Sequence, residues 1–206
     1  MNDYAQFADR DYDEQTFSEL RLEGELVKSR RFYGCRFTKC VLTEVDFSGS
    51  LFNDCTFEEC DLSLINVEGC EFTNVTFSAC KLMGVNWAVI QQEGKFLKPF
   101  DFINCNLNYS TFTGLKLAQV AFRECAAHDA DFAECDLTRA DFRHADLKDS
   151  RFLHSDLRSA DFRSAMNYDI TPEINEVKGA KFSLPEAVSL LRNIGIIIDD
   201  DNGESR

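Results

Sequence analysis

Phe or Leu returns at every fifth residue in the stretch "DADFAECDLTRADFRHADLKDSRFLHSDLRSADFR", which runs from Asp129 to Arg163. An amphipathic helix repeats its apolar residues about every 3.6 positions, and a half-buried strand repeats them at every second position. A period of five fits neither element. The repeat therefore predicts a chain that turns at regular intervals and stacks on itself, and no other feature constrains the fold as much.

The five-residue frame extends from Phe17 to Phe162, and 25 of its 30 slots hold Phe or Leu. A second slot, two residues earlier in each repeat, holds small residues such as Ala, Val and Ser. All nine Cys of the chain occupy this second slot: Cys35, Cys40, Cys55, Cys60, Cys70, Cys80, Cys105, Cys125 and Cys135. Because Cys alternates there with other small residues, we interpret it as a core filler and not as a metal ligand.

Successive units such as "ADFAE", "CDLTR", "ADFRH", "ADLKD" and "SDLRS" resemble the pentapeptide-repeat family over roughly residues 15–165. The resemblance implies an all-β fold, a right-handed, quadrilateral parallel β-helix with one pentapeptide on each side. The physics agrees, because a single coil cannot bury its apolar slots whereas stacked coils share one core. We expect the β-helix in residues 1–167 and a C-terminal cap and dimerisation segment with an acidic tail in residues 168–206.

A single bulge is predicted near residues 89–96. With twenty residues per coil, Phe17, Phe37, Phe57 and Phe77 form one column, and this column continues through Phe102 only if five residues are left out of the wall. The columns of Leu and of Cys require the same correction. Residues of this loop are candidates for a contact with a partner: Gln91, Gln92, Lys95 and Phe96.

The C-terminal segment follows a different pattern. Ser183 and Glu186 resemble a capping box, and Gly195 is a candidate for the end of the helix. A short apolar strand is expected at residues 196–198. We favour a homodimer through this segment, with a monomeric cap as the alternative. The expected interface residues are Leu184, Val188, Leu191, Ile194, Ile196, Ile197 and Ile198.

Composition excludes several classes of protein. The net charge of −14 should repel nucleic acid, so we expect no direct binding to DNA or RNA. No apolar run approaches the roughly 20 residues of a membrane helix, and the N-terminus lacks the pattern of a secretory signal, which favours a cytoplasmic protein. No catalytic motif, metal site or cofactor site is recognisable, so we expect a protein that is not an enzyme.

Charge is not evenly spread along the chain. Between Cys40 and Cys80 there is no Lys or Arg. The eight acids of this segment are the candidate contacts for a basic partner: Glu44, Asp46, Asp54, Glu58, Glu59, Asp61, Glu68 and Glu71. Over an expected rod of about 34 Å, the net charge corresponds to one charge per ~2.4 Å, against one per ~1.7 Å in duplex DNA.

Three stretches carry a closer resemblance to the microcin-immunity and albicidin-resistance type of pentapeptide protein, with the quinolone-resistance (Qnr) type more distant: "LMGVNW" (Leu82–Trp87), "NYDITPEIN" (Asn167–Asn175) and "KFSLPEAVSLL" (Lys181–Leu191). The resemblance implies that the chain binds DNA gyrase, with topoisomerase IV as a second candidate, and protects it from a toxin or drug by mimicking DNA. Two alternatives remain, a protein that sequesters the toxin and a pentapeptide scaffold with no topoisomerase role.

Overall fold

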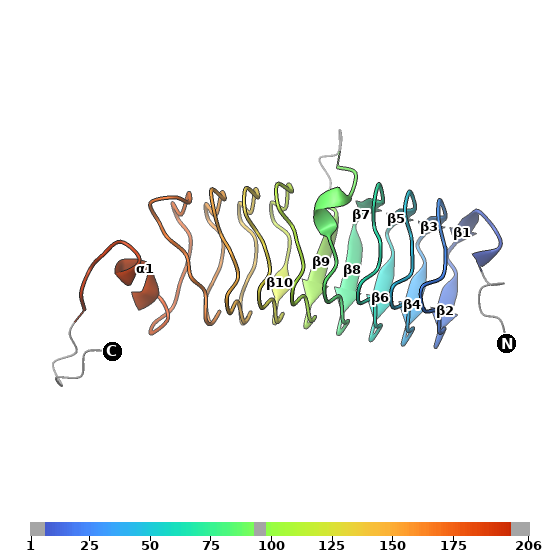
Figure 1. The fold of residues 1–206 in the computed structure, drawn as a ribbon, viewed down its shortest axis with the longest axis horizontal. Coiled ribbons are helices and arrows are strands. Elements are labelled where there is room, and N and C mark those ends of the chain that lie inside the picture. The colour runs from blue at the N-terminus through green and yellow to red at the C-terminus, as the bar shows by residue number, and fades with distance from the viewer. Residues whose placement is uncertain (1–6, 93–97, 199–206) are drawn as a thin grey trace.

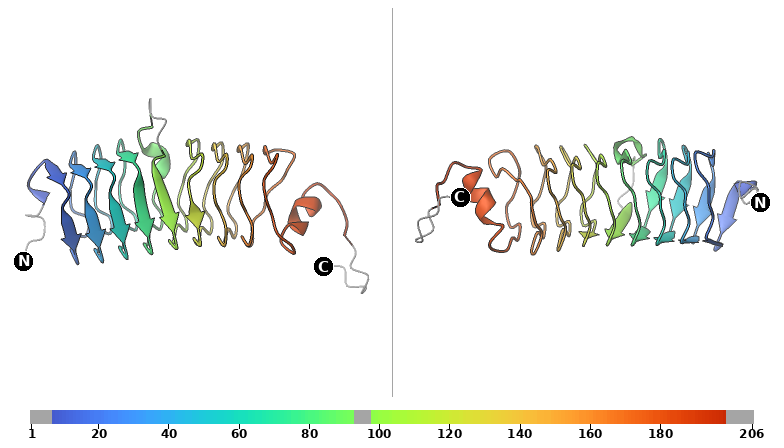
Figure 2. Two further views of the ribbon diagram at one scale, coloured as in Figure 1. Left: turned by 180° about the vertical axis from the view of Figure 1, so that it is seen from behind. Right: turned by 60° about the horizontal axis from the view of Figure 1, so that its bottom comes forward.

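The computed structural model describes residues 7–92 and 98–198. The chain winds into a parallel β-helix whose coils stack along one axis, with the first and last described segments at opposite ends of the rod (Figure 1). The same stack of coils is visible from behind and from below (Figure 2). The pentapeptide-repeat β-helix expected from the sequence is therefore confirmed.

Short parallel strands line two sides of the rod. One sheet has the order β1-β3-β5-β7, and the other has the order β10-β9-β8-β6-β4-β2. Strands pair with the coil that lies twenty residues further along, as in Arg31↔Leu51. The strands of the described residues are β1 (Asp11–Asp13), β2 (Thr16–Ser18), β3 (Arg31–Tyr33), β4 (Arg36–Thr38), β5 (Leu51–Asn53), β6 (Thr56–Glu58), β7 (Glu71–Thr73), β8 (Val75–Ser78), β9 (Phe100–Ile103) and β10 (Phe122–Arg123).

Each coil has four sides, and each side carries one inward residue from the five-residue frame. We number the sides in chain order by the inward residues of one coil: side 1 holds Phe17, side 2 Leu22, side 3 Val27 and side 4 Phe32. Side 1 carries the longer sheet and side 4 the shorter one. On sides 2 and 3 the coils are joined by single bridges such as Val41↔Asp61 and Asp46↔Asn66.

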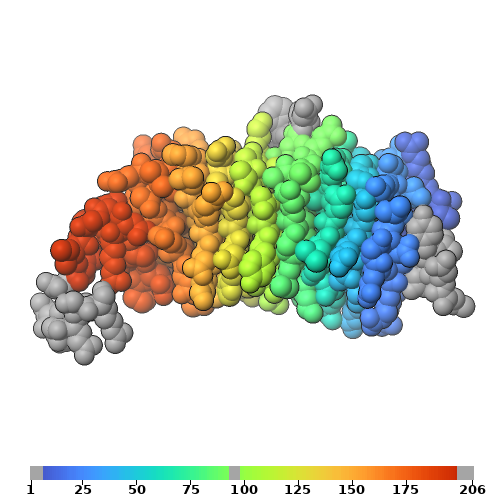
Figure 3. Space-filling view, viewed as in Figure 1, coloured from blue at the N-terminus to red at the C-terminus, as the bar shows by residue number. Residues whose placement is uncertain are grey.

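Stacked phenylalanine rings form the centre of side 1. Neighbouring ring centroids from Phe17 to Phe182 lie between 4.4 and 5.6 Å apart. The predicted continuation of the column from Phe77 to Phe102 is confirmed, with a centroid distance of 5.2 Å. The column also extends one coil beyond Phe162, the last slot of the predicted frame. The rod is thus held by one continuous core, and its space-filling surface shows closely packed coils (Figure 3).

The insertion that interrupts the frame lies on side 4. Up to Gln91, whose backbone N–H donates to Cys70, the coils pair with an offset of twenty residues. From Lys98, which accepts from the N–H of Asn74, the offset is twenty-five. Val89, Ile90 and Gln91 therefore remain in the wall, although the sequence placed the start of the bulge at residue 89. Val89 ends a 3-10 helix, η2 (Trp87–Val89), and residues 93–97 lie outside the described residues.

The C-terminal end is covered by side chains other than those expected. Val177, Phe182 and Leu190 pack against the core, and the helix α1 (Val188–Arg192) crosses the last coil. Backbone bridges continue to Asp161↔Lys181, beyond the boundary predicted at residue 167. The division of the chain at that residue stays a prediction.

Two local predictions for this end are wrong and one agrees with the structure. The capping box does not form, because α1 begins after Ala187 and the Ser183 hydroxyl accepts a hydrogen bond from the Ser164 N–H instead. Residues 196–198 form no strand. Gly195 does end the helix, with φ of 79°, and the N–H of Ile196 donates to Leu191 in the Schellman pattern.

Candidate interaction surface

The interior offers packing and no reactive chemistry. The thiol of Cys40 donates to the backbone oxygen of Phe17 (3.4 Å), in the coil below, and the hydroxyl of Ser110 donates in the same way to Leu82 (2.9 Å). All nine Cys are buried and free. Burial raises the pKa of Cys55 to about 12, so its thiol stays protonated and unreactive near neutral pH.

No metal site is present within residues 7–92 and 98–198, because no three His, Cys, Asp or Glu side chains gather around a common point. None of the helices in this described part of the chain has the length and apolarity needed to span a membrane.

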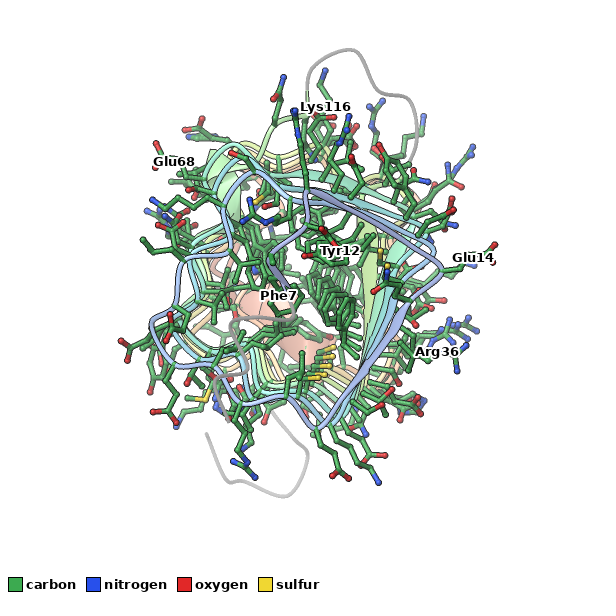
Figure 4. All side chains as sticks on the ribbon, turned by 90° about the vertical axis from the view of Figure 1, so that its right-hand side faces the viewer. Phe7, Tyr12, Glu14, Arg36, Glu68 and Lys116 are labelled. Atoms are coloured by element: carbon green, nitrogen blue, oxygen red, sulfur yellow. The ribbon has the colours of Figure 1, made fainter. Side chains whose placement is uncertain are left out.

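The eight acids between Cys40 and Cys80 do not share one face. The repeat places two of them on each side of the rod: Glu58 and Glu59 on side 1, Glu44 and Asp61 on side 2, Asp46 and Glu68 on side 3, Asp54 and Glu71 on side 4. In the view along the axis, Glu14, Arg36, Glu68 and Lys116 point outward around the rod, whereas Phe7 and Tyr12 point into it (Figure 4). The structure thus distributes the predicted contact residues around the axis.

Lysines from neighbouring coils contact three of these acids. Lys28 lies 2.7 Å from Asp46, Lys81 lies 3.6 Å from Asp61, and Lys39 lies 3.9 Å from Glu59. Burial raises the pKa of Asp46, but the Lys28 ammonium and the donors of Ser48 outweigh it and lower the pKa to about 2. Asp54 accepts hydrogen bonds from Asn53 and Asn74. These four acids therefore already have partners within the protein.

Three acids of the segment remain available to a partner. Glu44, Glu58 and Glu68 are exposed, and none of them forms an ion pair with another described residue. They lie on sides 2, 1 and 3 respectively. The described acidic surface is therefore smaller than the sequence indicated, and it faces three directions.

In the C-terminal half, arginines neutralise the aspartates of side 1. The Asp141 carboxylate accepts from Arg123 (2.7 Å) and Arg143 (2.8 Å), and Asp161 accepts from Arg163 (2.6 Å). Burial raises the pKa of Asp141, but these two guanidinium groups hold it well below its usual range. On side 1 of this half, the aspartates are therefore neutralised by arginines of the same or the neighbouring coil.

Of the four predicted loop contacts, only two can be described. Gln92 is not a core residue; its side-chain amide accepts from the N–H of Lys116 (2.9 Å) and donates to the carbonyl of the same residue (3.2 Å). The Gln92 side chain thus makes the two hydrogen bonds to Lys116 that the backbone of a regular coil would make at this point of the wall. Gln91 is exposed, and Lys95 and Phe96 lie outside the described residues.

The residues predicted to form a dimer interface lie at the C-terminal end and are accessible. Leu184 is 79% exposed and Ile197 is 88% exposed. Leu191, Ile194 and Ile196 are also exposed, and Val188 and Ile198 are partly buried.

Leu64 and Tyr109 are exposed apolar residues that the charge-based sequence analysis missed. The five-residue frame contains the signal, since each of them stands two residues after an inward Leu, in a slot that elsewhere holds mainly polar residues or Gly.

The geometry of a four-sided β-helix with stacked phenylalanines defines a class of protein. The chain matches the family described as "Pentapeptide repeat region" over residues 30–110 and 105–182. This protein is a member of the pentapeptide repeat family.

Solved structures show the same fold. Two trypsin-treated forms of QnrB1, a plasmid-mediated fluoroquinolone resistance protein, are similar to the chain with TM-scores of 0.69 and 0.65. Both are 16% identical in sequence; the first match covers 92% of this chain and 99% of that chain, and the second covers 90% and 100%. No curated protein matches the chain.

Proposed function

We propose that this protein binds DNA gyrase, with topoisomerase IV as a second candidate, and protects the enzyme from a toxin or drug. The observation that carries the proposal is the run of coils between Cys40 and Cys80, which contributes eight acids and no cation to a rigid rod. Such a rod attracts the basic surface on which a topoisomerase holds its DNA, and it repels DNA itself.

The arrangement of the acids around the axis supports mimicry of a duplex. Phosphates surround a DNA helix on every side, and the three available acids of this segment, Glu44, Glu58 and Glu68, face three of the four sides of the rod. A partner that grips one or two sides would contact only some of Glu44, Glu58 and Glu68. Single substitutions therefore indicate which side the enzyme contacts.

A homodimer through the C-terminal end is part of the proposal. Leu184 and Ile197 are largely exposed at the end of the rod, next to the helix that covers the core. Apolar side chains gathered at one place on a surface favour association with another protein surface. Two copies joined at this end would form a rod of twice the length, which matches an extended DNA-binding surface.

The test is a supercoiling assay with gyrase, with and without a panel of gyrase poisons, titrating the protein. The triple variant Glu44→Gln, Glu58→Gln, Glu68→Gln keeps every inward residue, and we expect it to need at least about tenfold more protein for equal protection. A control variant, Glu124→Gln, Glu134→Gln, Asp149→Asn, removes the same charge from exposed positions in the other half and should lose less than about threefold.

Binding to gyrase should also weaken as salt rises from about 0.1 M to about 0.3 M, because exposed charges are screened. A wild-type protein that neither binds nor protects gyrase contradicts the proposal. If it instead binds the toxin in a one-to-one complex with no affinity for gyrase, the sequestering alternative is correct.

A further inference from the structure

The corners between the sides of the rod have a left-handed backbone. Twenty-three residues other than Gly in the described chain have φ between 49° and 64°. For an L-residue this conformation is unfavourable, and it is tolerated best by Gly, Asn and Asp. Most corners of this rod accordingly carry Gly or a polar residue.

Leu64 and Tyr109 depart from this rule. Their φ angles are 60° and 64°, and their exposed fractions are 57% and 61%. Among the described residues with positive φ, only these two carry a large aliphatic side chain or the ring of a Phe, Tyr or Trp. Both side chains are more than half exposed, so burial offsets little of the cost of this backbone conformation. A local conflict of this kind, on an exposed surface, points to a contact with another molecule.

The two side chains belong to one corner. The N–H of Leu64 donates to Met83 (2.9 Å) and the N–H of Gly84 donates to Asn108 (2.9 Å), so Leu64, Gly84 and Tyr109 follow one another in successive coils. A Cβ atom on Gly84 would lie only 2.7 Å from Cδ2 of Leu64. The Leu64 side chain therefore lies across the glycine of the next coil, on the way to Tyr109. We call these three residues the corner ridge.

Acidic residues stand at both ends of the corner ridge. The N–H of Glu44 donates to Ser63, and the N–H of Tyr109 donates to His128, so Glu44 and Asp129 occupy the same corner one coil before and one coil after the ridge. Both are exposed, and neither forms an ion pair with another described residue. An apolar centre with a negatively charged rim is complementary to an apolar recess flanked by Lys or Arg.

We propose that the corner ridge docks into such a recess on the topoisomerase; this inference rests on the function proposed above. The surface of a DNA duplex carries phosphates and no exposed leucine, so DNA cannot make the contact that the corner ridge makes. The corner ridge would therefore let this protein bind the topoisomerase in preference to other basic surfaces. Because its contribution is apolar, it persists at salt concentrations that screen the acids.

The test replaces both ridge side chains with Asn, which accepts the left-handed backbone. The double variant Leu64→Asn, Tyr109→Asn should fold as well as the wild type, as circular dichroism can confirm, and lose about tenfold or more of its affinity for gyrase at both low and high salt. Gln119→Asn is the matched control, since Gln119 is an exposed corner residue with the same φ of 64° on side 4. It should stay within about twofold of the wild type.

The acidic rim has a different signature. The variant Glu44→Gln, Asp129→Asn should weaken binding at about 0.1 M salt and converge with the wild type at high salt. A ridge double variant with full affinity for gyrase overturns the inference while leaving the proposed function intact. A wild-type protein without affinity for gyrase overturns both. If light scattering shows that the double variant changes only self-association, the ridge is a contact between copies of this chain, and the inference is again overturned.

Discussion

At the scale of single residues, the repeat combines packing with hydrogen bonding. The small slot holds Cys, Ser or Ala because the side chain must fit between coils, and Cys and Ser also donate to a carbonyl of the coil below, as Cys135 does to Phe112 (3.0 Å). The Cys are therefore explained by the wall they stabilise. On the outside, the equivalent local interactions are those of Asp46 and Asp61, whose carboxylates accept from the N–H groups of Ser48 and Ser63.

The lowered pKa of Asp46 predicts that the free energy of unfolding depends on pH in the acid range. Its pKa is lowered to about 2, so its stabilising contribution is present above about pH 4 and is lost as the pH falls toward 2. We expect Asp46→Asn to cost about 1–2 kcal/mol in the free energy of unfolding at pH 7, and the difference from the wild type to shrink between pH 5 and pH 2. Urea unfolding at several pH values measures it. Glu44→Gln is the control, and a pH-independent cost for Asp46→Asn would contradict this account.

At the scale of elements, the loop is inserted without breaking the stack. The backbone pairing changes from an offset of twenty residues at Gln91 to twenty-five at Lys98, and the Gln92 side chain bonds both backbone groups of Lys116 across the gap. The neighbouring aromatic residues close the core beside it, with Trp87 and Phe100 in contact at a centroid distance of 5.0 Å.

Replacing Gln92 tests this role. Gln92→Ala leaves the N–H and carbonyl of Lys116 without their partner, and because both are exposed to water the expected cost is only about 1 kcal/mol in the free energy of unfolding. Hydrogen exchange at the Lys116 amide should accelerate, while that of Leu117 in the core stays slow. Gln91→Ala should change neither, since the wall bond of Gln91 is made by its backbone. Unchanged protection of Lys116 in Gln92→Ala would show that the side chain does not carry the bond.

At the scale of the whole molecule, the rod needs a cover at the end of its core. Val177, Phe182 and Leu190 provide it, and the apolar residues after them stay accessible. Removing residues 183–206 takes away Leu190 and uncovers Phe182. We expect this truncation to give monomer or aggregate in light scattering, in place of the proposed dimer. Removing only residues 199–206 should leave the assembly unchanged, and a longer truncation that still forms the same dimer would place the interface elsewhere.

The sequence alone was enough to predict the β-helix, the columns of Phe and Cys, and the existence of a five-residue insertion. It could do so because the side of the rod on which a residue lies depends only on its position in the repeat, so a count along the chain gives contacts between coils. The inward Phe142 and the small Ala140 were predictable for this reason.

The details that depend on side-chain reach and on the ends of the repeat became clear from the three-dimensional structure and not from the sequence. Lys28, Lys39 and Lys81 contact acids in adjacent coils, so a segment without cations in sequence is partly neutralised in space. Gln92 bonds the backbone of Lys116, twenty-four residues away, and Ser183 bonds Ser164 instead of capping its own helix. Each of these contacts joins two different coils through side chains that do not point into the core. Such side chains have several possible partners within reach, and the period of five does not specify which one they bind.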